Sequence, residues 1–84
     1  MNKKVTIYTW STCPFCVKAK RLLDAKGIGY TEIEISGQRD KLQELKAKTK
    51  SGTVPQIFID EKFIGGCDDL YALDRTGELE DLLA

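Results

Sequence analysis

The sequence predicts one α/β domain, residues 1–84, with a four-stranded mixed sheet and helices on both of its faces. Two observations predict this class. Short segments rich in β-branched and aromatic residues alternate with segments of helical periodicity, in the order β-α-β-α-β-β-α-α. The opening strand–helix–strand unit implies a right-handed crossover and a parallel strand pair, and the later hairpin adds antiparallel strands. A chain of 84 residues suits one domain.

The first half of the chain contains the strand–helix–strand unit. Residues 3–9 ("KKVTIYT") and residues 30–35 ("YTEIEI") alternate in the manner of strands. Between them, Pro14 stands where the first position of a helix is expected, and Gly27 is a helix stop. The helix carries one apolar stripe, formed by Cys16, Ala19, Leu22 and Leu23.

The second half adds a helix, a hairpin and two short helices. Residues 39–50 predict a helix with one apolar side, formed by Leu42, Leu45 and Thr49. Residues 56–60 ("QIFID") and 62–66 ("KFIGG") predict two short strands joined by a tight turn of charged residues. The remaining residues predict two short helices that divide at Gly77.

Composition and charge disfavour several classes of function. Thirteen basic and thirteen acidic side chains give a formal net charge of zero and are mixed along the chain, unlike a nucleic-acid-binding footprint. The one basic cluster, residues 46–50, is interpreted as the solvated face of a helix. No apolar segment is long enough to cross a bilayer, and residues 1–4 lead into a strand without the features of a signal peptide. We therefore expect a cytoplasmic protein with no membrane or nucleic-acid partner.

The motif Cys13-Pro14-Phe15-Cys16 is the strongest candidate for chemistry, as a structural disulfide, half of a metal site or a redox pair. The chain has three cysteines and no histidine, so it offers too few ligands for a closed zinc site, which usually takes four. Cytosolic thiols are kept reduced, which disfavours a lasting structural disulfide. A CxxC where the first strand of a βαβ unit passes into its helix is instead typical of thioredoxin-like redox proteins.

The position of the motif predicts different properties for its two thiols. Cys13 lies at or just before the helix N-terminus, where free backbone N–H groups and the positive end of the helix dipole favour a thiolate. Pro14 lacks an N–H that would be unpaired there in any case. Cys16 lies one turn further on the same face, more buried and within reach of a disulfide. We predict that Cys13 attacks and that Cys16 resolves.

Two further motifs lie in the second half. "GTVPQIFI", residues 52–59, places Pro55 at the start of a short strand, and the rarity of cis X–Pro bonds favours a trans bond there. In "GGCDDL", residues 65–70, the two glycines allow close approach of the backbone. Asp68 or Asp69 can cap the helix that follows, and taken alone both are interpreted as caps.

The motifs "TCPFC", "TVPQIFI" and "GGCDDLYAL", in this order and spacing, resemble the small dithiol glutaredoxins of bacteria from about residue 4 to the end. The resemblance implies the minimal thioredoxin fold (β-α-β-α-β-β-α), a monomer and a cis Val54–Pro55 bond. It implies an enzyme that uses glutathione to reduce protein disulfides and glutathione mixed disulfides, with no metal or other cofactor. The expected partners are glutathione and disulfide-containing or glutathionylated proteins, with ribonucleotide reductase among the candidates.

The resemblance also implies a glutathione site. Its residues would be Phe15, Arg39, Thr53, Val54, Pro55, Cys67, Asp68 and Asp69. Glutathione would pair its backbone with Val54 like an added strand. Its γ-glutamyl carboxylate would meet the backbone N–H groups of Cys67 and Asp68 at a helix N-terminus, and its ammonium would meet Asp68 or Asp69.

Two positions depart from the glutaredoxin pattern. Many relatives carry a lysine at the position of Trp10, where it can aid the thiolate and bind the glycine carboxylate of glutathione. A basic residue is also common at the position of Gly52. Arg39, Lys18 or Lys20 could supply the missing charge, and Arg39 is the preferred partner of the carboxylate.

Two alternative functions are compatible with parts of this pattern. A hydrogen donor of the same fold that is fed by thioredoxin reductase would lack "GGCDD", whose presence here argues against it. A carrier of an iron–sulfur cluster between two protomers mostly has glycine and serine at the positions of Pro14 and Cys16. The proline therefore disfavours the carrier.

Overall fold

The computed structural model describes residues 3–84, and its eight elements confirm the predicted order. The elements are β1 (Val5–Thr9), α1 (Pro14–Ala25), β2 (Thr31–Glu34), α2 (Arg39–Thr49), β3 (Gln56–Ile59), β4 (Lys62–Gly65), α3 (Cys67–Thr76) and α4 (Glu78–Leu83). The strands form one sheet in the order β2-β1-β3-β4, in which β1 and β2 are parallel and the other neighbours antiparallel. The predicted mixed sheet is confirmed. Residues 1–2, part of the segment interpreted as lacking a signal peptide, lie outside the described residues.

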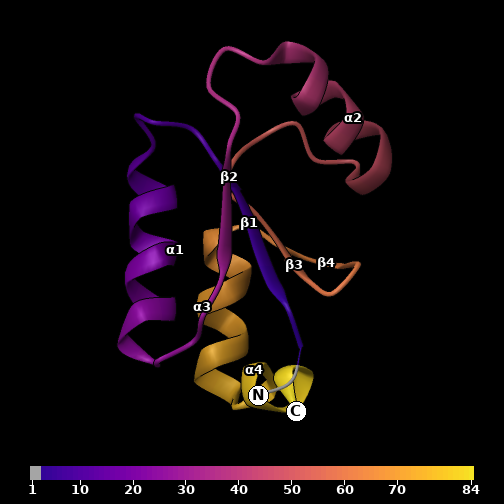
Figure 1. Cartoon of the computed structure of the whole chain (residues 1–84). Coiled ribbons are helices and arrows are strands. Elements are labelled where there is room, and N and C mark those ends of the chain that lie inside the picture. The colour runs from indigo at the N-terminus through magenta and orange to yellow at the C-terminus, as the bar shows by residue number, and fades with distance from the viewer. Residues whose placement is uncertain (1–2) are drawn as a thin grey trace.

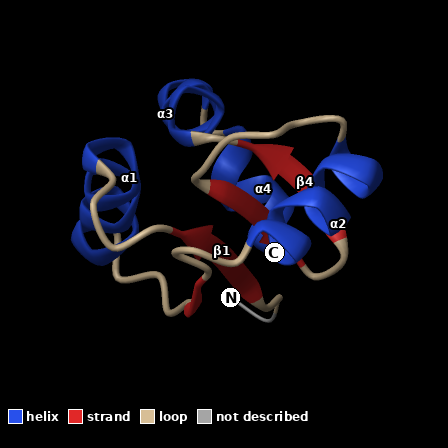
Figure 2. Cartoon of the chain, turned by 90° about the horizontal axis from the view of Figure 1, so that it is seen from above, coloured by secondary structure: helices blue, strands red, loops and turns tan. Residues whose placement is uncertain are grey.

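Helices cover the two faces of the sheet unequally (Figures 1 and 2). α1, α3 and α4 pack on one face over a large apolar cluster that includes Ile7 and Leu70. α2 packs on the other face over a smaller cluster of Ile35, Leu45 and Phe58. Each fully buried Leu or Ile stabilises the fold by roughly 1.5–3 kcal/mol. The larger cluster is therefore the main source of stability, and α2 is the less firmly held layer.

The predicted ends and faces of the helices are largely confirmed. Gly27 follows α1 with φ of 69°, and Gly77 separates α3 from α4 with φ of 79°, a conformation that favours glycine.

The strand 30–35 is confirmed as β2, but all four of its residues are exposed, Ile33 included. The reason is that β2 is an edge strand and α2 packs against Ile35, beyond its end. None of the described helices has both the length and the apolar character needed to span a membrane.

Candidate active site

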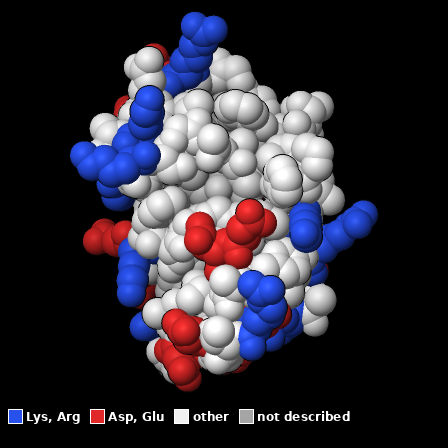
Figure 3. Space-filling model, turned by 180° about the vertical axis from the view of Figure 1, so that it is seen from behind, with Lys and Arg blue, Asp and Glu red and all other residues white. Residues whose placement is uncertain are grey.

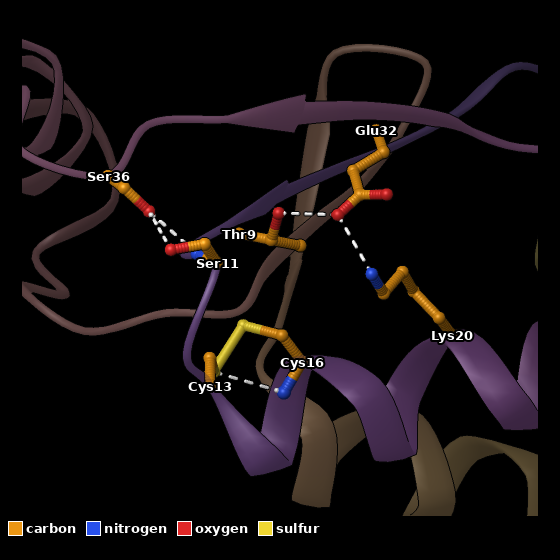
Figure 4. Close-up of polar contacts among 7 residues, drawn as sticks. All are labelled: Thr9, Ser11, Cys13, Cys16, Lys20, Glu32 and Ser36. Atoms are coloured by element: carbon orange, nitrogen blue, oxygen red, sulfur yellow. Dashed lines mark hydrogen bonds and ion pairs between the residues drawn. A yellow bond between two sulfur atoms is a disulfide. The ribbon is translucent and has the colours of Figure 1, made fainter.

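The two motif cysteines form a disulfide at the N-terminus of α1 (Figure 4). Their Cα atoms are 5.1 Å apart, an ordinary separation for a disulfide. Cys13 is the N-cap residue of α1, with extended backbone, and Pro14 begins the helix as predicted. The backbone N–H of Cys16 donates to Cys13 Sγ at 3.1 Å. The positive end of the helix therefore faces the sulfur of Cys13.

The two sulfurs differ in access. Cys16 is buried, with 1% of its surface exposed, whereas Cys13 is half-buried. Cys13 Sγ lies 3.9 Å from the carbonyl oxygen of Val54. The side chain of Phe15, between the two cysteines, is 57% exposed. An incoming molecule therefore reaches Cys13 before Cys16.

The loop before β3 lies against the disulfide. The Val54–Pro55 bond is cis, as the resemblance implies and contrary to the expectation from the frequency of cis bonds alone. Pro55 is buried and Val54 half-buried. Within residues 3–84, no hydrogen bond occupies the backbone N–H of Val54. Its backbone N–H is therefore free to pair with an extended ligand.

The buried amide of Gln56 organises this loop. Gln56 is fully buried, and its side-chain NH₂ donates to the carbonyl oxygens of Ser51 at 2.7 Å and Thr53 at 3.0 Å. Its Oε1 accepts a hydrogen bond from the Thr49 hydroxyl at 3.0 Å. The sequence prediction does not include Gln56 in the site. The available signal is a lone amide at the start of the otherwise apolar strand "QIFI".

The N-terminus of α3 closes on the same loop through two glycines. A Cβ added at Gly66 would lie 3.3 Å from the carbonyl oxygen of Pro55, so only a small residue allows this approach. Gly65 has φ of 122°, and a Cβ there would overlap the carboxylate of Asp69. The Gly66 N–H donates to Asp69 Oδ2 at 3.1 Å. Asp69 is therefore a capping residue, whereas the exposed carboxylate of Asp68 has no hydrogen-bond partner among the described residues.

These segments enclose a groove of about 300 Å³, within the range of small-molecule sites. It is lined by Phe15, Ser51, Thr53, Val54, Pro55, Phe63, Gly66, Cys67, Asp68 and Asp69. The groove thus brings together every predicted glutathione residue except Arg39. Ser51, Phe63 and Gly66 are additional lining residues that the sequence prediction does not include.

Comparison with known proteins decides the family. The glutaredoxin family model matches residues 5–64. Glutaredoxin 3 of Escherichia coli (strain K12) is 53% identical over 79 residues, which cover 94% of this chain and 95% of that protein. The chain belongs to the glutaredoxin family. Glutaredoxins are thiol–disulfide oxidoreductases.

Solved glutaredoxins share the fold. The dithiolic glutaredoxin 2-C-Grx1 of Trypanosoma brucei brucei has a TM-score of 0.88 and 42% identity, covering 98% of this chain and 88% of that one. The buckwheat glutaredoxin–glutathione complex has a TM-score of 0.89 and 32% identity, covering 96% of this chain and 76% of that one. These likenesses confirm the thioredoxin-type fold predicted for this glutaredoxin.

The basic residues considered for this glutaredoxin lie apart from the groove. Arg39 lines one recess with Trp10 and another with Gly52, the neighbour of the groove residue Thr53. Lys18 lies over the ring of Tyr71, 4.9 Å from its centroid. Lys20 forms an ion pair with Glu32 at 2.9 Å. Arg39 is therefore near the end of the groove, whereas Lys18 and Lys20 have other contacts.

A polar cluster lies behind the disulfide (Figure 4). The hydroxyl of the fully buried Thr9 donates to Glu32 Oε2 at 2.7 Å, and Lys20 Nζ donates to the same oxygen. The hydrogen bond from Thr9, followed by the contact with Lys20, lowers the pKa of Glu32. The cluster therefore ties β2 to β1 and α1 through a carboxylate.

Burial raises the pKa of Cys67, which keeps this thiol neutral at pH 7. On the face seen in Figure 3, acidic side chains gather near the middle and basic ones lie mostly at the edges. No three His, Cys, Asp or Glu side chains within residues 3–84 come together in a way that could hold a metal ion.

Proposed function

We propose that this glutaredoxin uses glutathione to reduce protein disulfides and to remove glutathione from mixed disulfides, with Cys13 as nucleophile and Cys16 as resolving thiol. The observation that carries the proposal is the position of Cys13. Cys13 is only half-buried, its sulfur faces the N-terminus of α1, and it lies against Val54, which lines a groove of ligand size. Because the thiolate is the attacking form, this position favours exchange at Cys13.

Glutathione is the proposed occupant of the groove, and the buckwheat glutaredoxin was solved as its complex with glutathione. The free backbone N–H of Val54 would pair with the tripeptide backbone. The first-turn N–H groups of Cys67 and Asp68 have no intrahelical partners and would bind the γ-glutamyl carboxylate. The free carboxylate of Asp68 would take the ammonium. Arg39, next to the recess that contains Gly52, is the proposed partner of the glycine carboxylate.

In the monothiol reaction, the Cys13 thiolate attacks the glutathione sulfur of a mixed disulfide. A bond forms between Cys13 Sγ and that sulfur, and the leaving protein thiolate takes a proton from water. The thiolate of a second glutathione then attacks the bound glutathione sulfur. This step releases oxidised glutathione and restores the Cys13 thiolate.

In the dithiol reaction, the Cys13 thiolate attacks a protein disulfide and breaks its S–S bond. Cys13 then forms a mixed disulfide with one protein sulfur, and the other leaves as a thiolate that takes a proton from water. Cys16 loses its proton and attacks Cys13 Sγ, which releases the reduced protein and forms the Cys13–Cys16 disulfide. The Cα separation of 5.1 Å permits this bond. Two glutathione molecules then reduce the pair and leave as oxidised glutathione.

The proposal also covers partners and location. Disulfide-containing or glutathionylated proteins are the proposed substrates, with ribonucleotide reductase among them. The protein is proposed to act as a cytoplasmic monomer that carries no resident cofactor.

The proposal is tested by replacing each motif cysteine with serine. Cys13→Ser is expected to reduce both reactions by on the order of 10³-fold or more, because the nucleophile is lost. Cys16→Ser is expected to retain removal of glutathione from a glutathione–cysteine mixed disulfide and to lose the reduction of protein disulfides. Steady-state rates with the two substrate types measure both effects. Retention of deglutathionylation by Cys13→Ser would refute the assignment.

A further inference from the structure

A second recess lies beside the active-site loop and shares no residue with the glutathione groove. Its volume is about 190 Å³, and its lining is Trp10, Ile35, Gly37, Gln38, Arg39 and Leu42. Trp10, Ile35 and Leu42 make most of this surface apolar. Of this lining, the reactions described above use only Arg39, as the proposed partner of the glycine carboxylate of glutathione.

Trp10 is the most unusual member of the recess. It is 40% exposed, and it lies only three residues before Cys13. Tryptophan is among the residues that contribute most to binding when a partner covers them. An exposed indole beside a redox cysteine is therefore suited to contact the substrate that this cysteine attacks.

The loop that carries Trp10 is held in place before any partner arrives. The Ser11 N–H donates to Ser36 Oγ at 2.6 Å, and the Ser36 hydroxyl donates to Ser11 Oγ at 3.1 Å (Figure 4). The backbone N–H of Ile35 donates to the carbonyl oxygen of Thr9 at 2.8 Å. Because the loop is already ordered, binding at Trp10 costs little conformational entropy.

The charge around the recess favours an acidic partner. Arg39 is the only charged residue that lines the recess, and it begins the segment 39–50, which contains five basic and two acidic side chains. Within residues 3–84, the only ion pair made by this segment joins Lys41 to Glu44 at 3.9 Å, so Arg39 has no acidic partner. A guanidinium at the edge of an apolar recess is complementary to a carboxylate next to an apolar side chain.

We propose that the recess binds a segment of the substrate protein that carries an apolar residue followed by an acidic one, close to the cysteine that bonds to Cys13. The proposal rests on the proposed function. Trp10 covers the apolar side chain, and Arg39 takes the carboxylate. Three residues of extended chain span at most roughly 10 Å, so the segment lies within three residues of the substrate cysteine. Glutathione occupies the groove and shares only Arg39 with the recess, so Arg39 holds the substrate carboxylate in the first step of the dithiol reaction, before glutathione binds.

The test uses the fluorescence of Trp10, the single tryptophan of the chain. Two peptides that contain no cysteine, one with Leu-Asp and one with Leu-Lys at the same position, are titrated into the oxidised protein. The Leu-Asp peptide is expected to shift the emission to shorter wavelength with about fivefold to tenfold higher affinity, as one favourable contact provides. Equal affinities, or no spectral change with either peptide, would overturn the proposal.

Kinetics with matched variants supply the second readout. With a disulfide peptide that carries Leu-Asp, Trp10→Ala is expected to raise KM about tenfold and to leave kcat unchanged. The rate with the glutathione–cysteine mixed disulfide should stay the same. Ile33→Ala is the control, because Ile33 is exposed to a similar extent, 38%, but lies on β2. An equal loss on both substrates would overturn the proposal, whereas inactivity of the unmodified protein on the small mixed disulfide would refute the proposed function alone.

Discussion

The groove proposed to bind glutathione and the recess that contains Trp10 lie beside the same disulfide but are built in different ways. In the groove, the cis Val54–Pro55 loop and the start of α3 approach so closely that a Cβ at Gly66 would lie 3.3 Å from the carbonyl oxygen of Pro55. The buried amide of Gln56 holds the loop, and Asp69 caps the helix. The recess is instead formed by the loop that carries Trp10, which a hydrogen bond between Ser11 and Ser36 holds in place, and by the less firmly packed α2. The N-terminus of α2 has no side-chain cap.

This difference separates two kinds of recognition. A rigid groove with fixed main-chain groups suits one small ligand of constant shape, because little ordering is needed on binding. An aromatic side chain with a neighbouring cation suits partners that share chemical character but differ in shape. The groove is accordingly the proposed site of glutathione, and the recess is the proposed contact for varied proteins.

Among the substitutions that should affect the groove and the recess differently, Gly65→Ala is expected to have the largest effect. At φ of 122° a side chain is strained, and the new Cβ would displace the Asp69 carboxylate. We expect a loss of about 1–3 kcal/mol in the free energy of unfolding from the backbone alone, together with a higher KM for glutathione. Urea unfolding and steady-state kinetics measure the two effects.

Gly29→Ala is the matched control for Gly65→Ala. Its φ lies outside the left-handed region, and an added Cβ would have no described atom within 4 Å. It should leave both stability and KM nearly unchanged. Binding of the Leu-Asp peptide at Trp10 should survive Gly65→Ala. Equal weakening of both sites would show that the two regions are not independent.

A smaller effect is expected from replacing the two neighbouring aspartates one at a time. Asp69→Ala removes the acceptor of the Gly66 N–H and should lower the free energy of unfolding by about 0.5–2 kcal/mol. Asp68→Ala leaves that hydrogen bond intact and should mainly raise the KM for glutathione. Both variants remove one negative charge from the first turn of α3, so their difference in stability isolates the cap. Equal destabilisation by the two would contradict the assignment of Asp69 as the cap.

Local patterns in the sequence predict most of the fold and the position of the redox pair. Hydrophobic periodicity predicts the strands and helices, and the helix start at Pro14 and the stop at Gly77 depend on backbone preferences of single residues. The burial of Cys16 follows from its place one turn inside α1. Such features could be predicted because they depend on residues close together in the chain.

The remaining features depend on contacts between distant segments. The cis Val54–Pro55 bond was expected only through the resemblance, because bond frequencies alone favour trans. The choice of Asp69 over Asp68 as the cap depends on the backbone direction at Gly66. The separation of Arg39 from the groove depends on where α2 packs, which the periodicity of α2 does not determine.

The smallest expected effect concerns Glu32, which joins β2 to β1 and α1 behind the disulfide. Because the Thr9 hydroxyl and the Lys20 ammonium lower its pKa from an ordinary value of 4.5, the carboxylate stabilises the folded state above that value. The stabilisation is lost as the pH falls through the lowered, folded-state pKa. Glu32→Gln should therefore reduce the free energy of unfolding at pH 7, by less than about 1 kcal/mol because solvent screens the partly exposed pair.

The pH dependence distinguishes this charge effect from a simple change of shape. The stability difference between the unmodified protein and Glu32→Gln should shrink below about pH 4.5 and nearly vanish in stronger acid, as urea unfolding at several pH values would measure. Glu34→Gln is the control, because Glu34 lies on the same strand and no ion pair or side-chain hydrogen bond to it is found among the described residues. A stability difference that stays constant from neutral to acid pH would mean that the Glu32 charge does not hold β2.

If the Glu32 charge does hold β2, Glu32→Gln should weaken peptide binding at Trp10 more than glutathione binding. The reason is that β2 leads directly to Ser36, whose contact with Ser11 supports the Trp10 loop.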